Sequence, residues 1–274
     1  MSVINTNIKS LISQNALARN GRDVQHAMEQ LSTGKRINSA ADDAAGLAIS
    51  NKMTSQIRGL DQAVRNANDG VSLLQTAEGA THEITNMLQR MRELAVQSAN
   101  DTYSDNDRVA LNKEMVQLED EITRIAGNTK WNNMPILSSD SITKNLQVGI
   151  ANDDESTISI AFEDLTSAGL EVTGLDVLSH ATSQAALDKL DAAITQVDSF
   201  RADLGAKINR LNYAADNLSN ISTNTSASRS RIQDADYAKA SSELARTQII
   251  QQAATAILAQ ANTDQQSVLK LLQG

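Results

Sequence analysis

The sequence has no cysteine and a single proline, and aromatic residues make up only 2% of it. The absence of cysteine excludes a disulfide framework and thiol chemistry. Few aromatic residues leave little of the large, shape-specifying bulk found in ordinary globular cores. Narrow seams between helices, by contrast, are filled by Leu, Ile, Val, Ala and Met. The composition therefore favours long helices that pack through such seams.

The charge balance and the short apolar runs exclude further classes of protein. The chain has 24 Lys and Arg against 33 Asp and Glu, a net charge of −9 without any Lys/Arg cluster, so we expect no nucleic-acid partner. No apolar run reaches the ~18 residues of a membrane-spanning helix. The N-terminal segment lacks the cationic start, apolar centre and small-residue cleavage site of a signal peptide. We therefore expect no membrane partner and no cleaved export signal.

The clearest pattern is a heptad repeat in residues 187–218, where apolar or long-stemmed residues alternate at spacings of three and four. Such a repeat predicts a helix that supercoils around a partner helix. A matching repeat in residues 53–74 supplies a partner from the other half of the chain. The repeats consist of Leu187, Leu190, Ile194, Val197, Arg201, Leu204, Ile208, Leu211, Ala215 and Leu218, and of Met53, Ile57, Leu60, Val64, Ala67, Val71 and Leu74.

Further helices are expected on the N-terminal side of this repeat. Residues 5–32 are amphipathic and end at Gly34, with an apolar stripe at Ile4, Ile8, Leu11, Asn15, Ala18, Val24, Met28 and Leu31. Ser39 and Asp42 have capping-box spacing for a helix over about 43–99. Ser104 and Asp107 have the same spacing for a shorter helix, whose seam is Leu111, Met115, Leu118, Ile122 and Ile125 and whose stop is Gly127.

The middle and the tail of the chain are less regular. Trp131 and Pro135 indicate irregular chain, alternation at 146–150 and 158–162 predicts a β-hairpin, and residues 163–182 read as a polar loop. The Ser/Thr/Asn-rich stretch Asn217–Ser230 is either a weak, hinge-like helical segment or a linker.

The last helix is apolar on more than one face, at Leu244, Ile250, Ala254, Ile257, Leu258, Ala261, Val268, Leu271 and Leu272. A helix of this kind needs several neighbours, and the chain has too little other material to supply them. Other copies of the same chain are the simplest source of these neighbours.

Together these patterns predict a mainly α fold, a long antiparallel helical coiled-coil or bundle rod with a small β-hairpin region. We expect two domains. Residues 1–42 with 236–274 form a coiled coil of the two terminal arms. Residues 43–235 form a helical bundle with the hairpin near 145–162.

No motif points to catalysis, a cofactor or a metal. His26, His82 and His180 stand apart, with no second histidine or carboxylate at metal-ligand spacing. Asp42-Asp43 and the acidic run 153–155 are better explained by a helix cap and a hairpin turn than by a cation. Nucleotide-binding, hydrolase and metalloprotease signatures are absent from the sequence, so we expect no enzyme.

Leu31 to Ser50 (LSTGKRINSAADDAAGLAIS) closely resembles bacterial flagellin, as do residues 1–17, 88–100 and 231–274. The resemblance implies a structural subunit that polymerises into the extracellular flagellar filament for motility. It also implies export by the flagellar type III apparatus without a cleaved signal. Residues 138–182 are too few for the projecting outer domains of larger flagellins, so the chain is similar to a minimal form with inner-tube and outer-tube domains only.

The resemblance also implies partners and site residues. The partners are other copies of the chain, an export chaperone on the C-terminal arm, the hook-associated junction and cap proteins, and host Toll-like receptor 5. Receptor recognition, or axial packing between subunits, falls on Leu88, Gln89, Arg90, Leu94 and Glu114. Packing in the filament core, or sensing by cytosolic immune proteins, falls on Leu269, Leu271 and Leu272.

Two alternative functions stay open from the sequence alone. A hook-filament junction protein has similar arms. A cytoplasmic helical signalling protein of the chemoreceptor type would also consist of long helices, but it would pair them without exposed apolar ends. The purified monomer would then be fully helical, which circular dichroism can test.

Overall fold

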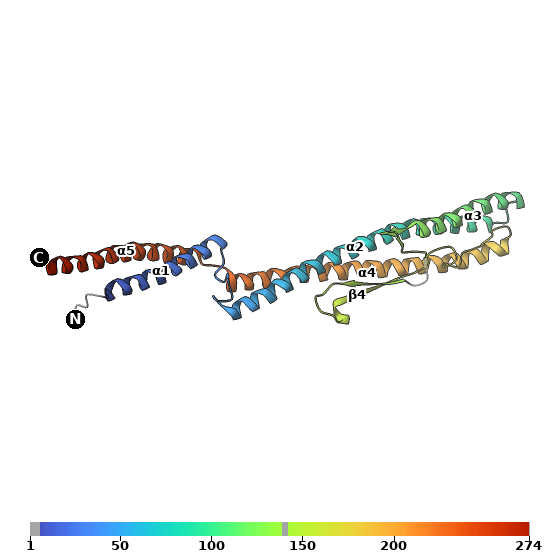
Figure 1. Ribbon diagram of the computed structural model, residues 1–274. Coiled ribbons are helices and arrows are strands. Elements are labelled where there is room, and N and C mark those ends of the chain that lie inside the picture. The colour runs from blue at the N-terminus through green and yellow to red at the C-terminus, as the bar shows by residue number, and fades with distance from the viewer. Residues whose placement is uncertain (1–5, 139–141, 274) are drawn as a thin grey trace. The chain divides into compact units, whose positions relative to one another are not determined.

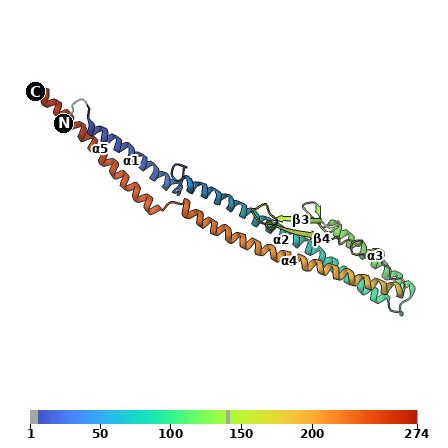
Figure 2. The ribbon, with the colours of Figure 1, turned by 90° about the horizontal axis from the view of Figure 1, so that it is seen from below.

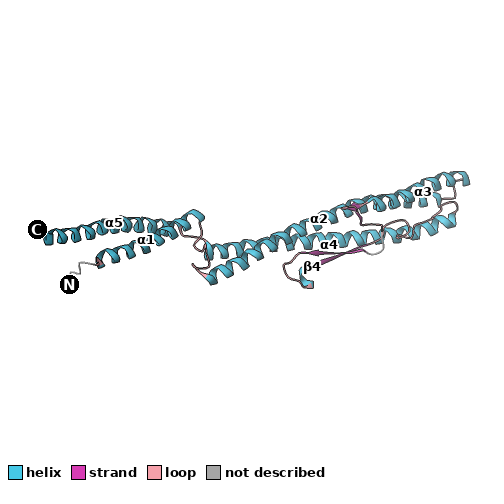
Figure 3. Cartoon of the chain, viewed as in Figure 1, coloured by secondary structure: helices cyan, strands magenta, loops and turns pink. Residues whose placement is uncertain are grey.

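The computed structural model describes residues 6–138 and 142–273, with the backbone alone from residue 264 on. The helices in this part of the chain (Figure 1) are α1 (Ile8–Thr33), α2 (Ala44–Ser98), α3 (Asp105–Asn128), α4 (His180–Gln233) and α5 (Tyr237–Gln273). Two antiparallel hairpins (Figure 3) pair β1 (Lys130–Trp131) with β2 (Met134–Pro135) and β3 (Ile142–Gln147) with β4 (Thr157–Phe162). The mainly α fold with a small β-hairpin region is confirmed.

The chain divides into two compact units, Met1–Ser55 with Asn224–Gly274, here the arm unit, and Gln56–Thr223, here the bundle unit. The expected domain boundaries lay in the loops near residues 42 and 236. The observed division falls inside α2 and α4, so each of these helices contributes residues to both units.

Both heptad seams are confirmed. Along α4, fully buried residues such as Leu190, Val197, Leu204 and Leu211 alternate with half-buried ones. The half-buried residues include Arg201, whose long stem lies within the seam while its guanidinium lies 3.8 Å from Asp198. The facing seam of α2 is buried in the same alternating way. An apolar core therefore extends along α2 and α4 in the bundle unit, and Leu60, Ala63 and Leu218 form a second, smaller cluster.

The β3–β4 hairpin lies over the groove between α2 and α4. Phe162 of β4 packs edge-to-face on Phe200 of α4, with ring centroids 6.5 Å apart. On the α2 side, Leu146 covers Gly70 so closely that an added Cβ would lie 2.2 Å from its Cδ1 atom. The missing side chain at Gly70 therefore lets the hairpin approach the helix backbone.

The hairpin register differs from the sequence expectation. The first strand covers residues 142–147 rather than 146–150, and it pairs Ile142 with Phe162 and Gln147 with Thr157. The apolar residue Val148 lies in the connection, where its N–H donates to the carbonyl of Ser156. Alternation alone could not distinguish a strand from a connection that also buries alternate residues.

Two irregular segments are more ordered than the sequence suggested. Asn132 and Asn133, both with positive φ, form the two-residue turn between β1 and β2, where we expected irregular chain. The segment 163–179 is a loop as expected, but it is not simply polar. It places Leu165, Leu170, Val172 and Val177 in the core.

The helix caps agree in part with the expected ones. Ser104 and Asp107 form the predicted capping box of α3. Asp42 instead accepts hydrogen bonds from the backbone of the preceding turn, and Asp43 caps α2 by accepting from the N–H of Gly46 at 2.8 Å. Gly127 lies inside α3, which ends one residue later.

Residues 217–230 are helical and not a linker, because α4 continues through them to Gln233, and the division between the two units falls within this segment. Several hydroxyl groups there are satisfied locally or across to α2. Thr223 donates to the carbonyl of Ser219 at 3.0 Å, and Ser222 donates to Asp61 at 2.9 Å. These bonds let polar side chains occupy a long helix without competing with its backbone.

We predict that Leu211→Asp unfolds the bundle unit at a lower temperature and denaturant concentration than the parent. Leu211 is fully buried, so the substitution leaves an unpaired carboxylate in the seam at a cost of ~3 kcal/mol or more. Tyr213→Asp, at a position 77% exposed on the same helix, is the control and should change stability little. Equal midpoints for the two variants in urea unfolding would refute the seam assignment.

Glycines of α2 provide a second prediction. An added Cβ at Gly79 meets no atom within 4 Å, so Gly79→Ala should stabilise the protein by about 0.5–1 kcal/mol through helix propensity. Gly70→Ala carries the same propensity gain but must displace Leu146. We expect it to lose that gain and to loosen the hairpin, as measured by urea unfolding and by limited proteolysis near residues 148–156. A stabilising Gly70→Ala would contradict the docked hairpin.

Candidate assembly surfaces

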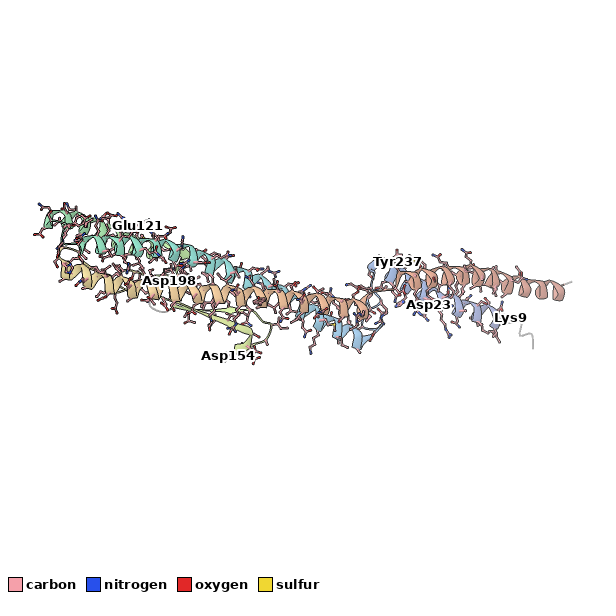
Figure 4. The ribbon with its side chains drawn as sticks, turned by 180° about the vertical axis from the view of Figure 1, so that it is seen from behind. Lys9, Asp23, Glu121, Asp154, Asp198 and Tyr237 are labelled. Atoms are coloured by element: carbon pink, nitrogen blue, oxygen red, sulfur yellow. The ribbon has the colours of Figure 1, made fainter. Side chains whose placement is uncertain are left out.

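The arm unit is built on an antiparallel contact between α1 and α5, in which Cα atoms of the two helices approach within 8 Å. Figure 2 shows the two helices side by side, and Figure 4 shows Lys9 and Tyr237 at opposite ends of the pair. The seam is partly polar, and its half-buried members include Leu17, Val24 and Leu31 of α1 and Leu244 and Leu258 of α5. Its buried members are Ser10, Asn20 and Ala27 on α1, and Ala240, Thr247 and Ala261 on α5.

Two asparagines connect the helices directly. Asn20 is 6% exposed and donates from Nδ2 to the carbonyl of Thr247 at 2.8 Å. Asn7 donates from Nδ2 to the carbonyl of Ala261 at 3.0 Å, and its side-chain oxygen caps α1 by accepting from the N–H of Ser10. A side-chain amide thus reaches the backbone of the partner helix at two levels.

Most of the predicted apolar stripe of α1 lies outside the contact with α5. Ile8, Leu11, Asn15, Ala18 and Met28 are exposed, and only Val24 and Leu31 of the described stripe are half-buried; Ile4 lies outside the described residues. α5 likewise exposes Ile249, Ile250 and Ile257. Periodicity identified an apolar face on α1, but it could not tell an internal face from one left open.

An open apolar groove follows one side of the α1–α5 contact. It encloses about 330 Å³ and is lined by Lys9, Ile12, Ile257, Gln260 and Ala261. Ile12 and Ile257 are 63% and 59% exposed. A groove of this size and character fits apolar side chains of another helix.

The segments that connect the arms to α2 and α4 are held together by the backbone. The N–H of Ala235 donates to the carbonyl of Gly34 at 2.9 Å, and the N–H of Arg36 donates to the carbonyl of Gln233 at 2.7 Å. Gly34 ends α1 in the left-handed conformation, with φ at 70°. The end of α1 and the start of α5 are therefore pinned to each other.

A second candidate surface surrounds Arg90 in the bundle unit. Arg90 donates from Nε to Glu114 of α3 and from Nη1 to Glu93 one turn along α2, each at 2.9 Å. These hydrogen bonds, first to Glu114 and then to Glu93, raise the pKa of Arg90 above its ordinary value. Gln89, Arg90 and Glu114 are exposed, so they form a charged surface patch across α2 and α3.

Leu88 and Leu94 do not belong to that surface. Both are fully buried, and Leu88 is part of the apolar core. They lie on the inward side of α2, where they support the helix that presents Arg90. The backbone of Leu269, Leu271 and Leu272 lies in α5, but their side chains lie outside the described residues.

Two of the three histidines have structural partners, and His82 is exposed on α2. His26 Nε2 lies 3.3 Å from Asp42, and Nδ1 of His180 donates to the carbonyl of Ala99 at 2.6 Å. Asp154 lies at the tip of the hairpin turn (Figure 4), where the neighbouring Asp153 accepts from the N–H of Ser156.

Within residues 6–138 and 142–273, no group of three or more His, Cys, Asp or Glu side chains is placed to hold a metal ion. No described helix is apolar over a length sufficient to span a membrane.

Sequence reasoning missed the interhelical amides and Glu93. A usable signal was present, since Ser13, Asn20 and Ala27 repeat at heptad spacing on α1. Together with Ser10, Leu17, Val24 and Leu31 this repeat forms a seam with alternating spacings of three and four, but the stripe through Ile8 and Leu11 was the more evident pattern.

Comparison with known proteins identifies the family. The model of the bacterial flagellin N-terminal helical region matches residues 4–142, and that of the C-terminal helical region matches residues 187–272. The chain is 46% identical over 271 residues to a flagellin of Halalkalibacterium halodurans, covering 99% of this chain and 100% of that protein. It is 40% identical over 284 residues to a flagellar filament core protein of Brachyspira hyodysenteriae, covering 99% and 100%.

Solved structures are similar as well. A flagellar hook-associated protein of Vibrio parahaemolyticus shares the fold, with a TM-score of 0.59 over 70% of this chain and 100% of that one, at 15% identity. The crystal structure of Bacillus cereus flagellin is 34% identical, with a TM-score of 0.49 over 56% of this chain and 88% of that one. On the family models and the full-length relatives, the chain belongs to the bacterial flagellin family.

Proposed function

We propose that copies of this flagellin pack against one another through the exposed apolar faces of α1 and α5. As a member of a family of structural proteins, the chain is a subunit of the extracellular bacterial flagellar filament and not an enzyme. The proposal concerns which helix faces contact neighbouring subunits in the filament.

The observation that carries the proposal is apolar surface without an intramolecular partner. Leu11 and Ile12 on α1, and Ile249 and Ile257 on α5, are each at least half exposed. Ile12 and Ile257 line one groove, and exposed apolar surface that several residues share marks an interface. Its burial contributes ~25 cal/mol per Å², and a helical polymer realises that gain once per subunit.

The two alternative functions are less well supported. The hook-associated protein resembles this chain in fold alone. Both flagellin family models, by contrast, match the terminal regions of this chain. A signalling protein of the chemoreceptor type would hide its apolar helix faces inside the bundle. The exposed faces of α1 and α5 do not fit that arrangement.

Further partners follow from the same surfaces. The C-terminal arm exposes isoleucines along α5, so it needs shielding before assembly, which an export chaperone supplies. The hook-associated junction and cap proteins contact the ends of the filament. We assign export without a cleaved signal, and a role for Leu269, Leu271 and Leu272 in core packing or cytosolic immune sensing, on the family resemblance.

Recognition by Toll-like receptor 5 is the second candidate function. The exposed patch of Gln89, Arg90 and Glu114 supports it, because an exposed arginine with charged neighbours suits a polar interface. The buried Leu88 and Leu94 act by holding α2 in place. The same patch also suits axial packing between subunits, and the two roles are compatible.

Removal of residues 236–274 should leave a soluble protein that cannot polymerise. This truncation deletes the whole of α5 and with it half of the proposed assembly surface. The bundle unit should keep its helices and its melting transition, as measured by circular dichroism. Electron microscopy of truncated protein seeded with filament fragments is the decisive measurement, and filaments in that sample would exclude α5 as an essential surface.

Arg90→Ala with Glu114→Ala should lower activation of Toll-like receptor 5 in reporter cells by at least about tenfold. The melting temperature should hardly change, since both side chains are exposed and surface substitutions have small effects. The matched control is Arg124→Ala with Glu121→Ala, which removes another exposed Arg–Glu pair of the same unit. Full signalling by the Arg90/Glu114 variant would refute the receptor proposal. A large fall in its melting temperature would show instead that the Arg90–Glu114 pair stabilises the bundle unit.

A further inference from the structure

α1 contains the one Asn-Gly pair of the sequence, Asn20-Gly21. Packing does not require the glycine, because a Cβ added at Gly21 would meet no atom within 4 Å. A glycine inside a helix is destabilising relative to alanine. It also affects the residue before it, since without a Cβ its backbone nitrogen is the least hindered neighbour that an asparagine side chain can have.

An asparagine before such a nitrogen can lose its side-chain amide without a catalyst, and asparagine is a thermolabile residue for this reason. The Gly21 nitrogen attacks Cγ of Asn20 and forms a C–N bond. Nδ2 leaves as ammonia, with the proton that the Gly21 nitrogen gives up. Water then opens the cyclic imide at either carbonyl and yields aspartate or isoaspartate. Both products carry a new carboxylate, and isoaspartate also adds a methylene to the main chain.

The paired arm unit prevents this attack. In a helix the Gly21 nitrogen is engaged in a backbone hydrogen bond, and the side chain of Asn20 tilts toward the N-terminus, away from that nitrogen. Nδ2 of Asn20 also donates to the carbonyl of Thr247 at 2.8 Å, and Asn20 is only 6% exposed. The reaction therefore requires α1 to open locally, and its rate follows the opened fraction.

Conversion would reverse the contribution of Asn20 to the seam. An ionised carboxylate accepts hydrogen bonds but cannot donate one, so it would face the carbonyl oxygen of Thr247 with no proton between them. The seam is nearly closed at this position, and burial of an unpaired charge is costly. An isoaspartate would also interrupt α1, because its longer main chain does not fit the helical hydrogen-bond spacing.

We infer that Asn20-Gly21 is a site of spontaneous deamidation that the pairing of α1 with α5 protects. Conversion of Asn20 in an opened arm prevents that arm from pairing again. A subunit whose arms stay apart for long is thereby lost to assembly, whereas a subunit with paired arms keeps its asparagine. The consequence for assembly rests on the proposed function, but the site and its protection do not.

Peptide mass spectrometry of the full chain tests the site. The protein is incubated at mildly alkaline pH, in native buffer or in urea that unfolds it. Cleavage at glutamate then releases residues 1–29, in which Asn15 precedes alanine and serves as an internal reference. We expect Asn20 to convert in urea and at least about tenfold more slowly in native buffer, which corresponds to ~1.4 kcal/mol of opening free energy. Gly21→Ala, which fits the open space at this position, is the matched control and should convert far more slowly in urea.

Asn20→Asp tests the consequence directly. Hydrogen exchange of the α1 backbone amides should become at least about tenfold faster than in the parent, and the critical concentration for seeded polymerisation should rise. The matched control is Gln25→Glu, because it makes the same amide-to-acid change at an exposed position of α1. Its hydrogen exchange and its critical concentration should equal those of the parent.

The outcomes separate the inference from the proposed function. Conversion of Asn20 no faster than in Gly21→Ala overturns the site, and equal rates in native buffer and in urea overturn its protection. Parental hydrogen exchange in Asn20→Asp overturns the effect on pairing, and fast exchange with normal polymerisation overturns the effect on assembly. A parent protein that never forms filaments counts against the proposed function instead, and the conversion rates still decide the site.

Discussion

The packing of α4 against α2 is the interaction on which the bundle unit depends. Alternating residues along both helices close a continuous apolar core that includes Leu74, Val197 and Leu204. The β3–β4 hairpin has no core of its own, since a two-stranded hairpin is at best marginally stable alone. It is ordered because its buried face, which carries both Leu146 and Phe162, packs on the open position at Gly70 and on Phe200. The loop 163–179 contributes leucines and valines to the same core.

A different constraint governs the arm unit, where two helices have more apolar surface than they can bury on each other. Two packed helices can hide only one side each, so α1 and α5 must leave another side open. The chain closes the seam with small and polar residues and with half-buried residues such as Leu17 and Leu258, and it leaves Leu11, Ile12 and Ile257 exposed.

The surface patch around Arg90 illustrates the same separation of roles along one helix. Leu88 and Leu94 anchor α2 in the core, while Arg90 between them is exposed and held by Glu93 and Glu114. A continuous sequence motif on a helix therefore contains both buried residues, which anchor the helix in the core, and exposed residues, which are available to a partner. The helical period of 3.6 residues determines which is which, because it directs neighbours in the sequence to different sides.

The sequence by itself determined the long helices, the two heptad seams, the capping box of α3 and the family. These features depend on local periodicity, local caps and blocks of identical residues, all of which are visible without coordinates. It also showed that α1 has an apolar stripe. Only the tertiary structure decided that this stripe faces outward, that Asn20 closes the seam, that Leu88 and Leu94 are buried, and where β3 begins. Each of these depends on which of several chemically suitable surfaces meet, and that choice follows from long-range contacts that a one-dimensional pattern does not contain.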